Sequence, residues 1–156
     1  MIALFPGSFD PFTYGHLDVA ERVCAIADRL IIGVGVNPVK RGLIAPEERV
    51  VLIREATAHL GGVEVVLLQG ATMDEASRLG ADLIVKGVRS SIDVDYEAPQ
   101  AVFNREIGGV DTWWIPTRPT LAHVSSSAVR ELVGLEKDIS RYVPPAIERF
   151  LTDNRS

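Results

Sequence analysis

The segment at positions 6–16 combines small residues, hydroxyl groups and a histidine in a way suited to binding phosphate. It reads Pro-Gly-Ser-Phe-Asp-Pro-Phe-Thr-Tyr-Gly-His and lies between an apolar run and a helical pattern. Gly7 allows the backbone to approach a ligand closely, and Ser8 offers both a hydroxyl and an N–H. Gly15 and His16 fall at the start of the helix, where free N–H groups and the helix dipole attract phosphate. Each residue alone could belong to an ordinary turn or helix cap, but their combination in one loop favours an anion site.

Basic residues and serines later in the chain suit the same kind of ligand. Of the 16 cations 13 are Arg and three are Lys, and Lys40 and Lys86 each follow an apolar strand-like run. The net charge of −5 argues against a general nucleic-acid coat, which needs a basic face to neutralise phosphates. A few cations in one cleft of an acidic protein suit a small anionic ligand. The run Ser125–Ser127 opens a helix, where one serine would suffice as a cap, so three favour phosphate binding.

Several common catalytic and binding arrangements are absent from the sequence. It contains no GxxxxGK followed by Ser or Thr, and Gly33-Val34-Gly35 lies inside an expected strand without a third glycine. It also contains no GxSxG elbow and no candidate Ser-His-Asp arrangement. The only cysteine, Cys24, excludes an internal disulfide framework and a CxxC metal knuckle. Cys24 falls on the apolar stripe of its helix and is expected in the core.

Short β-branched runs alternate with amphipathic helical patterns along the chain. The runs are continuous rather than alternating, which is typical of a parallel sheet covered by helices on both faces. We therefore predict an α/β fold with an open, Rossmann-like, five-stranded parallel sheet, whose ligand lies beyond the carboxyl ends of the strands. The expected strands are Ile2–Phe5, Leu30–Val36, Val63–Leu68, Asp82–Val85 and Thr112–Ile115.

The helical patterns fall between and after these strands. The first buries Leu17, Ala20, Val23, Cys24 and Ala27, and the second runs from Pro46 past Leu60 to a stop at Gly61-Gly62. The others are expected at about Met73–Leu79, at about Asp93–Ile107, from Ser125 onward, and at Pro144–Leu151.

Composition predicts one folded domain over residues 1–156 in the cytoplasm. Apolar residues make up 47% and charged residues 24%, as in ordinary globular domains. The longest apolar or glycine run, Leu30–Val36, has seven residues, whereas a membrane helix needs ~20. The N-terminus lacks the basic and apolar regions of a signal peptide, so no membrane association is expected.

Four separated motifs resemble one family of nucleotidylyltransferases. Pro-Gly-Ser-Phe-Asp-Pro-x-x-x-Gly-His is similar to the signature of enzymes that share an HxGH motif. Thr13 in place of the first histidine resembles the phosphopantetheine adenylyltransferase branch. The other matches are the lysine loop Asn37–Lys40 with Glu47-Glu48-Arg49, then Lys86-Gly87-Val88-Arg89 with Asp95-Tyr96-Glu97, and Val124–Ser127 with Arg130.

This resemblance implies a reaction, a cofactor and an assembly. The reaction is transfer of AMP from ATP to 4′-phosphopantetheine, which yields dephospho-coenzyme A and pyrophosphate. The family also implies Mg²⁺, held mainly by the ATP phosphates rather than by protein ligands, a homohexamer, and coenzyme A as a feedback inhibitor. The acceptor phosphate is already a nucleophile, so the protein needs only to align the substrates and neutralise charge, without a covalent intermediate.

The resemblance also assigns residues by type of contact. His16, Lys40, Arg89 and Ser127 are the expected catalytic residues. The expected ATP-binding residues are Gly7, Ser8, Phe9, His16, Gly87, Val88, Arg89, Glu97, Leu121, Ala122, His123, Val124, Ser125, Ser126 and Ser127. The expected acceptor-binding residues are Ser8, Lys40, Thr72 and Lys86.

Some features leave alternatives open. Lys86 stands where many relatives have Arg and lacks the bidentate fork of that residue. Pro99 lies in the fourth helical pattern and is expected to bend it, which affects the placement of Glu97. His59 is expected at the end of a surface helix, and Trp113-Trp114 in strand packing. The alternative functions are a sister nucleotidylyltransferase with another phosphate acceptor and a non-catalytic ATP-binding module.

Overall fold

The computed structural model describes residues 1–155 as an alternation of strands and helices. The strands are β1 (Ile2–Gly7), β2 (Arg29–Val34), β3 (Val63–Leu67), β4 (Leu83–Val88) and β5 (Asp111–Pro116). The helices are α1 (Tyr14–Cys24), α2 (Pro46–Ala56), α3 (Thr72–Arg78), α4 (Ser91–Gly108), α5 (Ser126–Gly134) and α6 (Pro145–Asp153), with a short 3₁₀ turn η1 (Pro119–Leu121).

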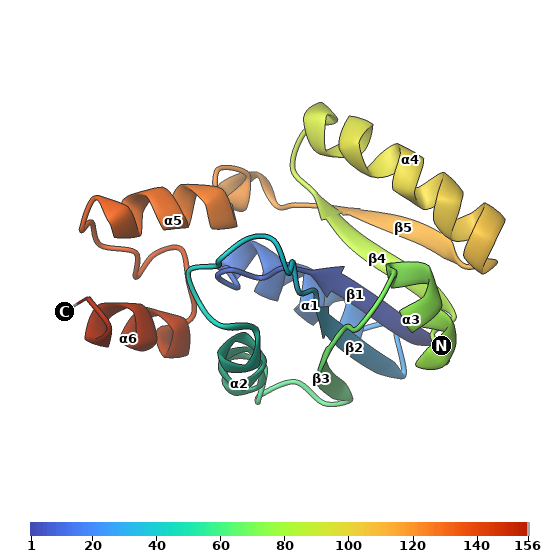
Figure 1. Cartoon of the computed structure of the whole chain (residues 1–156), viewed down its shortest axis with the longest axis horizontal. Helices are drawn as coiled ribbons and strands as arrows, with labels where there is room; N and C mark the ends of the chain where they lie inside the picture. Colours follow the sequence, from blue (N-terminus) through green and yellow to red (C-terminus); the bar gives the residue numbers. More distant parts are fainter. Residues whose placement is uncertain (156) are drawn as a thin grey trace.

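All five strands are parallel, in the order β3-β2-β1-β4-β5, and helices cover both faces of the sheet (Figure 1). The side chains of β2 are apolar at successive positions because they enter two cores, one on each face of the sheet. Leu30 and Ile32 point into a core shared with α1, α2, α5 and α6, whereas Ile31 points into a second core that includes Ala76 of α3. A strand buried on both faces needs apolar side chains at successive positions. The predicted fold class is therefore confirmed.

Strand order reverses between β1 and β4, and the two strands separate there. They pair only at Ala3 with Leu83 and at Leu4 with Ile84, although β1 pairs with β2 as far as Gly7. Beyond Leu4 and Ile84, the carboxyl-terminal halves of β1 and β4 leave a crevice between them. Such a crevice at the reversal of strand order is the usual ligand site of open parallel sheets.

Several element ends differ from the sequence-based prediction. β4 continues to Val88, so Lys86 lies within the strand, opposite Trp114 of β5, rather than after it. α2 ends at Ala56, five residues before Gly61, because the chain turns at Thr57, whose hydroxyl donates to the Ile53 carbonyl at 2.7 Å.

The remaining differences concern exposure and helix continuity. α1 ends at Cys24, which is half-buried rather than fully buried, and Ala27 lies beyond the helix. α4 continues through Pro99 as one helix from Ser91 to Gly108. Trp113 is 52% exposed, which corrects the expectation that it packs within the sheet. Within residues 1–155, no helix combines the length and the apolar character needed to span a bilayer.

Candidate active site

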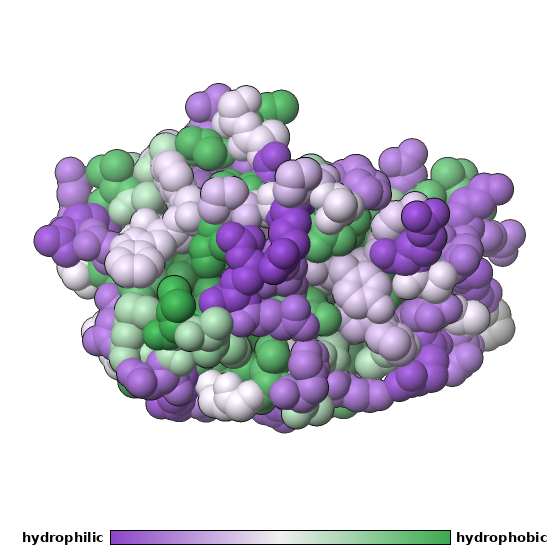
Figure 2. Space-filling model, turned by 180° about the vertical axis from the view of Figure 1, so that it is seen from behind, coloured by the Kyte–Doolittle hydropathy of each residue, from purple (hydrophilic) through white to green (hydrophobic). Residues whose placement is uncertain are grey.

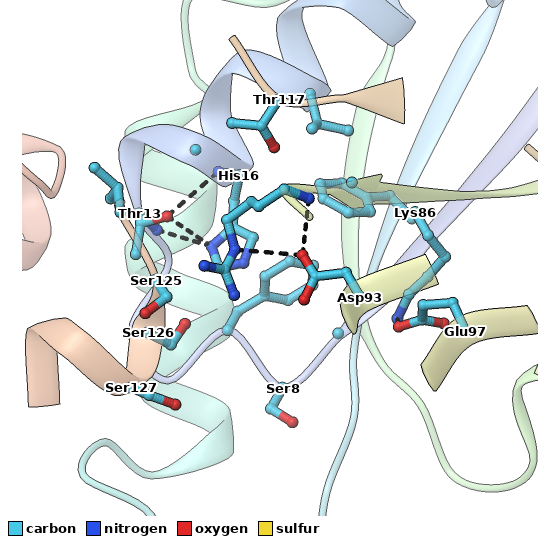
Figure 3. Close-up of a pocket in the computed structure, with 18 of the residues that line it drawn as sticks. Ser8, Thr13, His16, Lys86, Asp93, Glu97, Thr117, Ser125, Ser126 and Ser127 are labelled. Atoms are coloured by element: carbon cyan, nitrogen blue, oxygen red, sulfur yellow. Dashed lines mark hydrogen bonds and ion pairs between the residues drawn. The ribbon is translucent and has the colours of Figure 1, made fainter. Parts of the chain in front are cut away.

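The crevice between β1 and β4 opens into a pocket of about 520 Å³. Its walls come from the end of β1, the loop into α1, the first turns of α1, the end of β4, the first turns of α4, Thr117 after β5, and the N-terminus of α5. In Figure 3, the serines of α5 lie on one side of His16, and Asp93 and Glu97 of α4 lie on the other. The volume falls in the range of small-molecule sites, and the lining is rich in N–H, hydroxyl and cationic groups.

The loop between β1 and α1 is held by donors from outside the pocket. The carbonyl of Gly7 accepts from Gly35 N–H at 2.8 Å, and the carbonyl of Ser8 accepts from the Arg49 guanidinium at 3.1 Å. Within residues 1–155, the N–H groups of Ser8 and Phe9 have no protein acceptor. Phe9 has a left-handed φ of 51°, a conformation that turns successive N–H groups into an anion-binding concavity.

Gly7 is required by the ring of Phe9. A Cβ at position 7 would lie 2.9 Å from the end of that ring, which packs edge-on against Phe5 and His16 at centroid distances of 5.2 and 5.0 Å. The glycine therefore allows the aromatic floor of the pocket to close beneath the loop.

His16 is held in one tautomer by Thr13. The Thr13 N–H donates to Nδ1 of His16 at 3.0 Å, and the His16 N–H donates to the Thr13 hydroxyl at 3.4 Å, forming a reciprocal cap of α1. Because Nδ1 is an acceptor here, the proton of the neutral ring lies on Nε2. Burial, together with the positive charges of Lys86 and Arg89, lowers the pKa of His16 from 6.5 to about 3. His16 is thus a neutral donor, and burial rather than the helix terminus is the main cause.

Lowering the pH is expected to destabilise the fold through His16. Between the ordinary pKa of 6.5 and the folded pKa of about 3, the unfolded chain binds more protons than the folded one. The free energy of unfolding therefore has its full value above pH 6.5, where His16 is neutral in both states. It falls as the pH is lowered from 6.5 toward the folded-state pKa of about 3. The loss approaches ~1.4 kcal/mol per pH unit. Urea unfolding from neutral pH down to about pH 4 should show a steeper decline for the wild type than for His16→Gln, and equal slopes would contradict this.

Two cations of the pocket, Lys86 and Arg89, are paired with carboxylates of α4. Lys86 Nζ lies 3.2 Å from Glu97 Oε1, and both side chains are largely buried. Arg89 Nε lies 3.6 Å from Asp93 Oδ2, and the same oxygen accepts from the Arg89 N–H at 2.8 Å. Asp93 and Glu97 are four residues apart, so they lie on the same face of α4. One helix face therefore supplies partners to both cations.

The serine run at α5 contributes backbone donors as well as hydroxyls. Ser125 is the N-cap and accepts from the Ala128 N–H at 3.1 Å, and Ser126 donates to the Pro11 carbonyl at 2.8 Å. The Ser127 hydroxyl accepts from Arg130 at 3.0 Å. Among the described residues, the N–H groups of Ser126 and Ser127 have no protein acceptor. The helix terminus thus presents two free donors and its positive dipole end to the pocket.

Comparison with known proteins identifies the chain. The cytidylyltransferase-like family model matches residues 4–132. A phosphopantetheine adenylyltransferase from Streptococcus gordonii is 43% identical over 152 residues, which cover 96% of this chain and 93% of that protein. The chain belongs to the phosphopantetheine adenylyltransferase family. It is accordingly a nucleotidyltransferase, which removes the non-catalytic binding module from the alternatives.

A solved structure supports the fold assignment. The Vibrio parahaemolyticus protein, provisionally described as a nicotinate-nucleotide adenylyltransferase, superposes with a TM-score of 0.73. That likeness covers 97% of this chain and 91% of the other at 20% identity, and therefore concerns the fold alone. The likeness therefore supports the overall fold of this adenylyltransferase-family chain.

Many of the residues expected from the family resemblance line the pocket. They are Gly7, Ser8, Phe9, His16, Lys86, Gly87, Arg89, Glu97, Val124, Ser125, Ser126 and Ser127. The pocket wall does not include the other expected residues. Of these, Lys40 is exposed in the loop before α2, Thr72 opens α3, and Val88 ends β4. Leu121, Ala122 and His123 precede α5, where the His123 ring packs edge-on against Tyr142 at 5.9 Å.

Other pocket residues were not expected from the sequence. Asp93, Tyr96 and Ile92 line it from α4, and Thr117 lines it from beyond β5. The four-residue spacing of Asp93 from Glu97 was a usable signal, since it predicts a shared helix face, whereas Arg89 precedes α4 and its contact with Asp93 could not be predicted from helix spacing. Thr117 gave no signal, because its position depends on the length of β5. His59 lies outside the pocket, in the turn after α2, where it contacts Glu21 at 3.1 Å.

Proposed function

We propose that the protein transfers AMP from ATP to 4′-phosphopantetheine, forming dephospho-coenzyme A and pyrophosphate, the penultimate step of coenzyme A biosynthesis. The observation that carries this proposal is the meeting of three kinds of donor in one pocket: the neutral His16 ring, the cations Lys86 and Arg89, and the free N–H groups of α5. The 43% identity to a phosphopantetheine adenylyltransferase supports this acceptor over that of a sister enzyme.

The proposed reaction is a direct in-line attack. An oxygen of the acceptor phosphate attacks the α-phosphorus of ATP as the bond to the bridging oxygen of pyrophosphate breaks. The attacking phosphate is already an anion, so no general base and no covalent intermediate are needed. The protein lowers the barrier by fixing the two phosphates in line and by neutralising charge as the bond breaks. The Nε2–H of His16 supplies a donor that requires no change in protonation.

We assign roles to groups of residues on this basis. His16, Lys40, Arg89 and Ser127 act on the reacting phosphates. ATP is bound by the loop residues Gly7, Ser8 and Phe9, by Gly87, Val88 and Arg89 at the end of β4, by Glu97 of α4, and by the segment 121–127. Ser8, Lys40, Thr72 and Lys86 bind the acceptor.

Mg²⁺ enters this proposal with the nucleotide. Within residues 1–155, no group of three or more His, Cys, Asp or Glu side chains is arranged to hold a metal ion. The pocket carboxylates Asp93 and Glu97 are already paired with Arg89 and Lys86. These surroundings fit a cation held mainly by the ATP phosphates, where Mg²⁺ shields their charge from the attacking anion.

Exposed apolar side chains on α4 bear on how the protein assembles. Away from the pocket, α4 exposes the large apolar side chains Val102, Phe103 and Ile107 at 52, 47 and 70%. Apolar side chains also reach the surface among polar ones on the face seen in Figure 2. Such surface favours burial between subunits, and we propose a cytoplasmic homohexamer with coenzyme A as a feedback inhibitor. Light scattering that gave a monomer mass at micromolar concentration would contradict the assembly.

One assay tests the reaction. Pyrophosphate release is measured with ATP and Mg²⁺ while each acceptor is supplied in turn: 4′-phosphopantetheine, glycerol phosphate and nicotinamide mononucleotide. Turnover with phosphopantetheine alone is the expected result. Turnover only with another acceptor would select a sister enzyme, and no turnover with any of them would overturn the proposed reaction.

A further inference from the structure

A buried ion pair lies beneath two loops, outside the pocket wall. Asp10 and Arg49 are 7% and 6% exposed, and Nε of Arg49 lies 3.5 Å from Oδ1 of Asp10. Neither side chain lines the pocket. A buried ion pair is retained without penalty only when further hydrogen bonds satisfy its remaining atoms. The partners of Asp10 and Arg49 therefore indicate what the pair holds in place.

These partners belong to two different loops. Both oxygens of Asp10 accept backbone N–H groups, one from Leu43 and one from Ile44, each at 2.8 Å. Arg49 donates from Nε to the Ile44 carbonyl at 2.7 Å and from Nη1 to the Ser8 carbonyl at 3.1 Å. The pair thus connects the loop that carries Ser8 to the loop that precedes α2.

Gly42 allows the second loop to approach the pair. A Cβ at position 42 would lie 2.2 Å from Nη2 of Arg49 and 2.7 Å from Oδ2 of Asp10. The φ of Gly42 lies outside the left-handed region, so the demand for glycine is steric. An alanine there would displace either the loop or the guanidinium, and both changes alter the spacing of the two loops. Lys40 lies two residues earlier, in a segment without helix or strand.

We infer that Asp10 and Arg49 are positioning residues that set the Lys40 loop against the Ser8 loop and thereby determine affinity for the acceptor phosphate. This inference rests on the proposed function, in which Lys40 and Ser8 contact that phosphate. ATP also contacts Gly7, Ser8 and Phe9 in this proposal, but most of its proposed contacts lie elsewhere, at the end of β4, on α4 and in the segment 121–127. A change in the spacing of the two loops therefore affects the acceptor more than ATP.

The test uses the full chain with Gly42→Ala, because this variant disturbs the pair without removing a buried charge. Gly42→Ala should raise the KM for phosphopantetheine by roughly ten- to a hundredfold, the range for loss of a charge-assisted contact. The KM for ATP should change much less than the KM for phosphopantetheine. Gly61→Ala is the matched control, since a Cβ there meets nothing within 4 Å.

A double-mutant cycle with Lys40→Ala then separates positioning from general damage. If Gly42 acts through Lys40, adding Gly42→Ala to Lys40→Ala should raise the acceptor KM little further. Full additivity, or equal increases in the KM for ATP and for acceptor, would overturn the inference. Wild-type protein without phosphopantetheine-dependent pyrophosphate release would instead overturn the proposed function. Melting temperatures of all variants identify any loss that comes from unfolding.

Discussion

Replacing His16 with alanine is expected to lower kcat by roughly 10²–10³-fold while ATP binding stays nearly intact. The cap with Thr13 leaves the ring proton on Nε2, and the low pKa keeps the ring neutral at physiological pH. A donor aimed at charge that grows only as the bond breaks stabilises the transition state more than bound ATP. The measurements are kcat, ATP affinity and melting temperature on the same variant.

The alternative is a histidine that only caps α1. Loss of a cap costs ~1 kcal/mol of stability and leaves ordinary turnover in the folded fraction. His59→Ala is the matched control, because His59 is exposed and contacts only Glu21 among the described hydrogen-bond partners. A near-normal kcat in well-folded His16→Ala protein would remove His16 from the mechanism and weaken the nucleotidyl-transfer proposal.

Neutralising Lys40 or Lys86 is expected to raise the KM for phosphopantetheine by roughly ten- to a hundredfold, and much more than the KM for ATP. A charge-assisted contact with phosphate contributes ~1.5–3 kcal/mol. Lys86 has a second effect, because its removal leaves the largely buried Glu97 carboxylate without its cation. Lys86→Met should therefore weaken acceptor binding more than Lys40→Met.

The third lysine is the control for both variants. Lys137 follows α5 on the surface and does not line the pocket, so Lys137→Met should leave both KM values unchanged. Equal losses for ATP and acceptor in the Lys40 and Lys86 variants would show that these lysines are not specific to the acceptor. Steady-state kinetics with each substrate varied in turn makes the distinction.

The sequence predicted those features that depend on local pattern. The continuous run at Leu30–Ile32 indicated a strand buried on both faces, and the serines at the start of α5 indicated a helix start. The position of Lys86 within β4 could not be predicted, because it depends on pairing with Trp114, 28 positions later. Helix ends at Cys24 and Ala56 were also missed, since apolar residues beyond them still pack on the core from turns.

Long-range polar contacts were the other limit. Asp10 stands in a turn-like motif and Arg49 in a helix start, and neither pattern shows that they meet beneath two loops. The same holds for Thr117, which reaches the pocket because β5 ends at Pro116. In each case the decisive information is the spatial neighbour, which has no counterpart in residue spacing. Asp93 is a partial exception, since its four-residue spacing from Glu97 could have indicated that both carboxylates share one face of α4.

The separation of β1 and β4 in the chain ties ligand binding to completion of folding. Leu4 and Ile84 pair across 80 positions, and the pocket wall extends from Phe5 to Arg130. A chain that stops before β4 lacks one side of the crevice, so it has no place for a nucleotide. A ligand that binds only the folded state stabilises it by about 2.7 kcal/mol at a hundred times its Kd. Bound nucleotide therefore protects the molecule as a unit, and its presence reports that β1, β4 and α5 have all assembled.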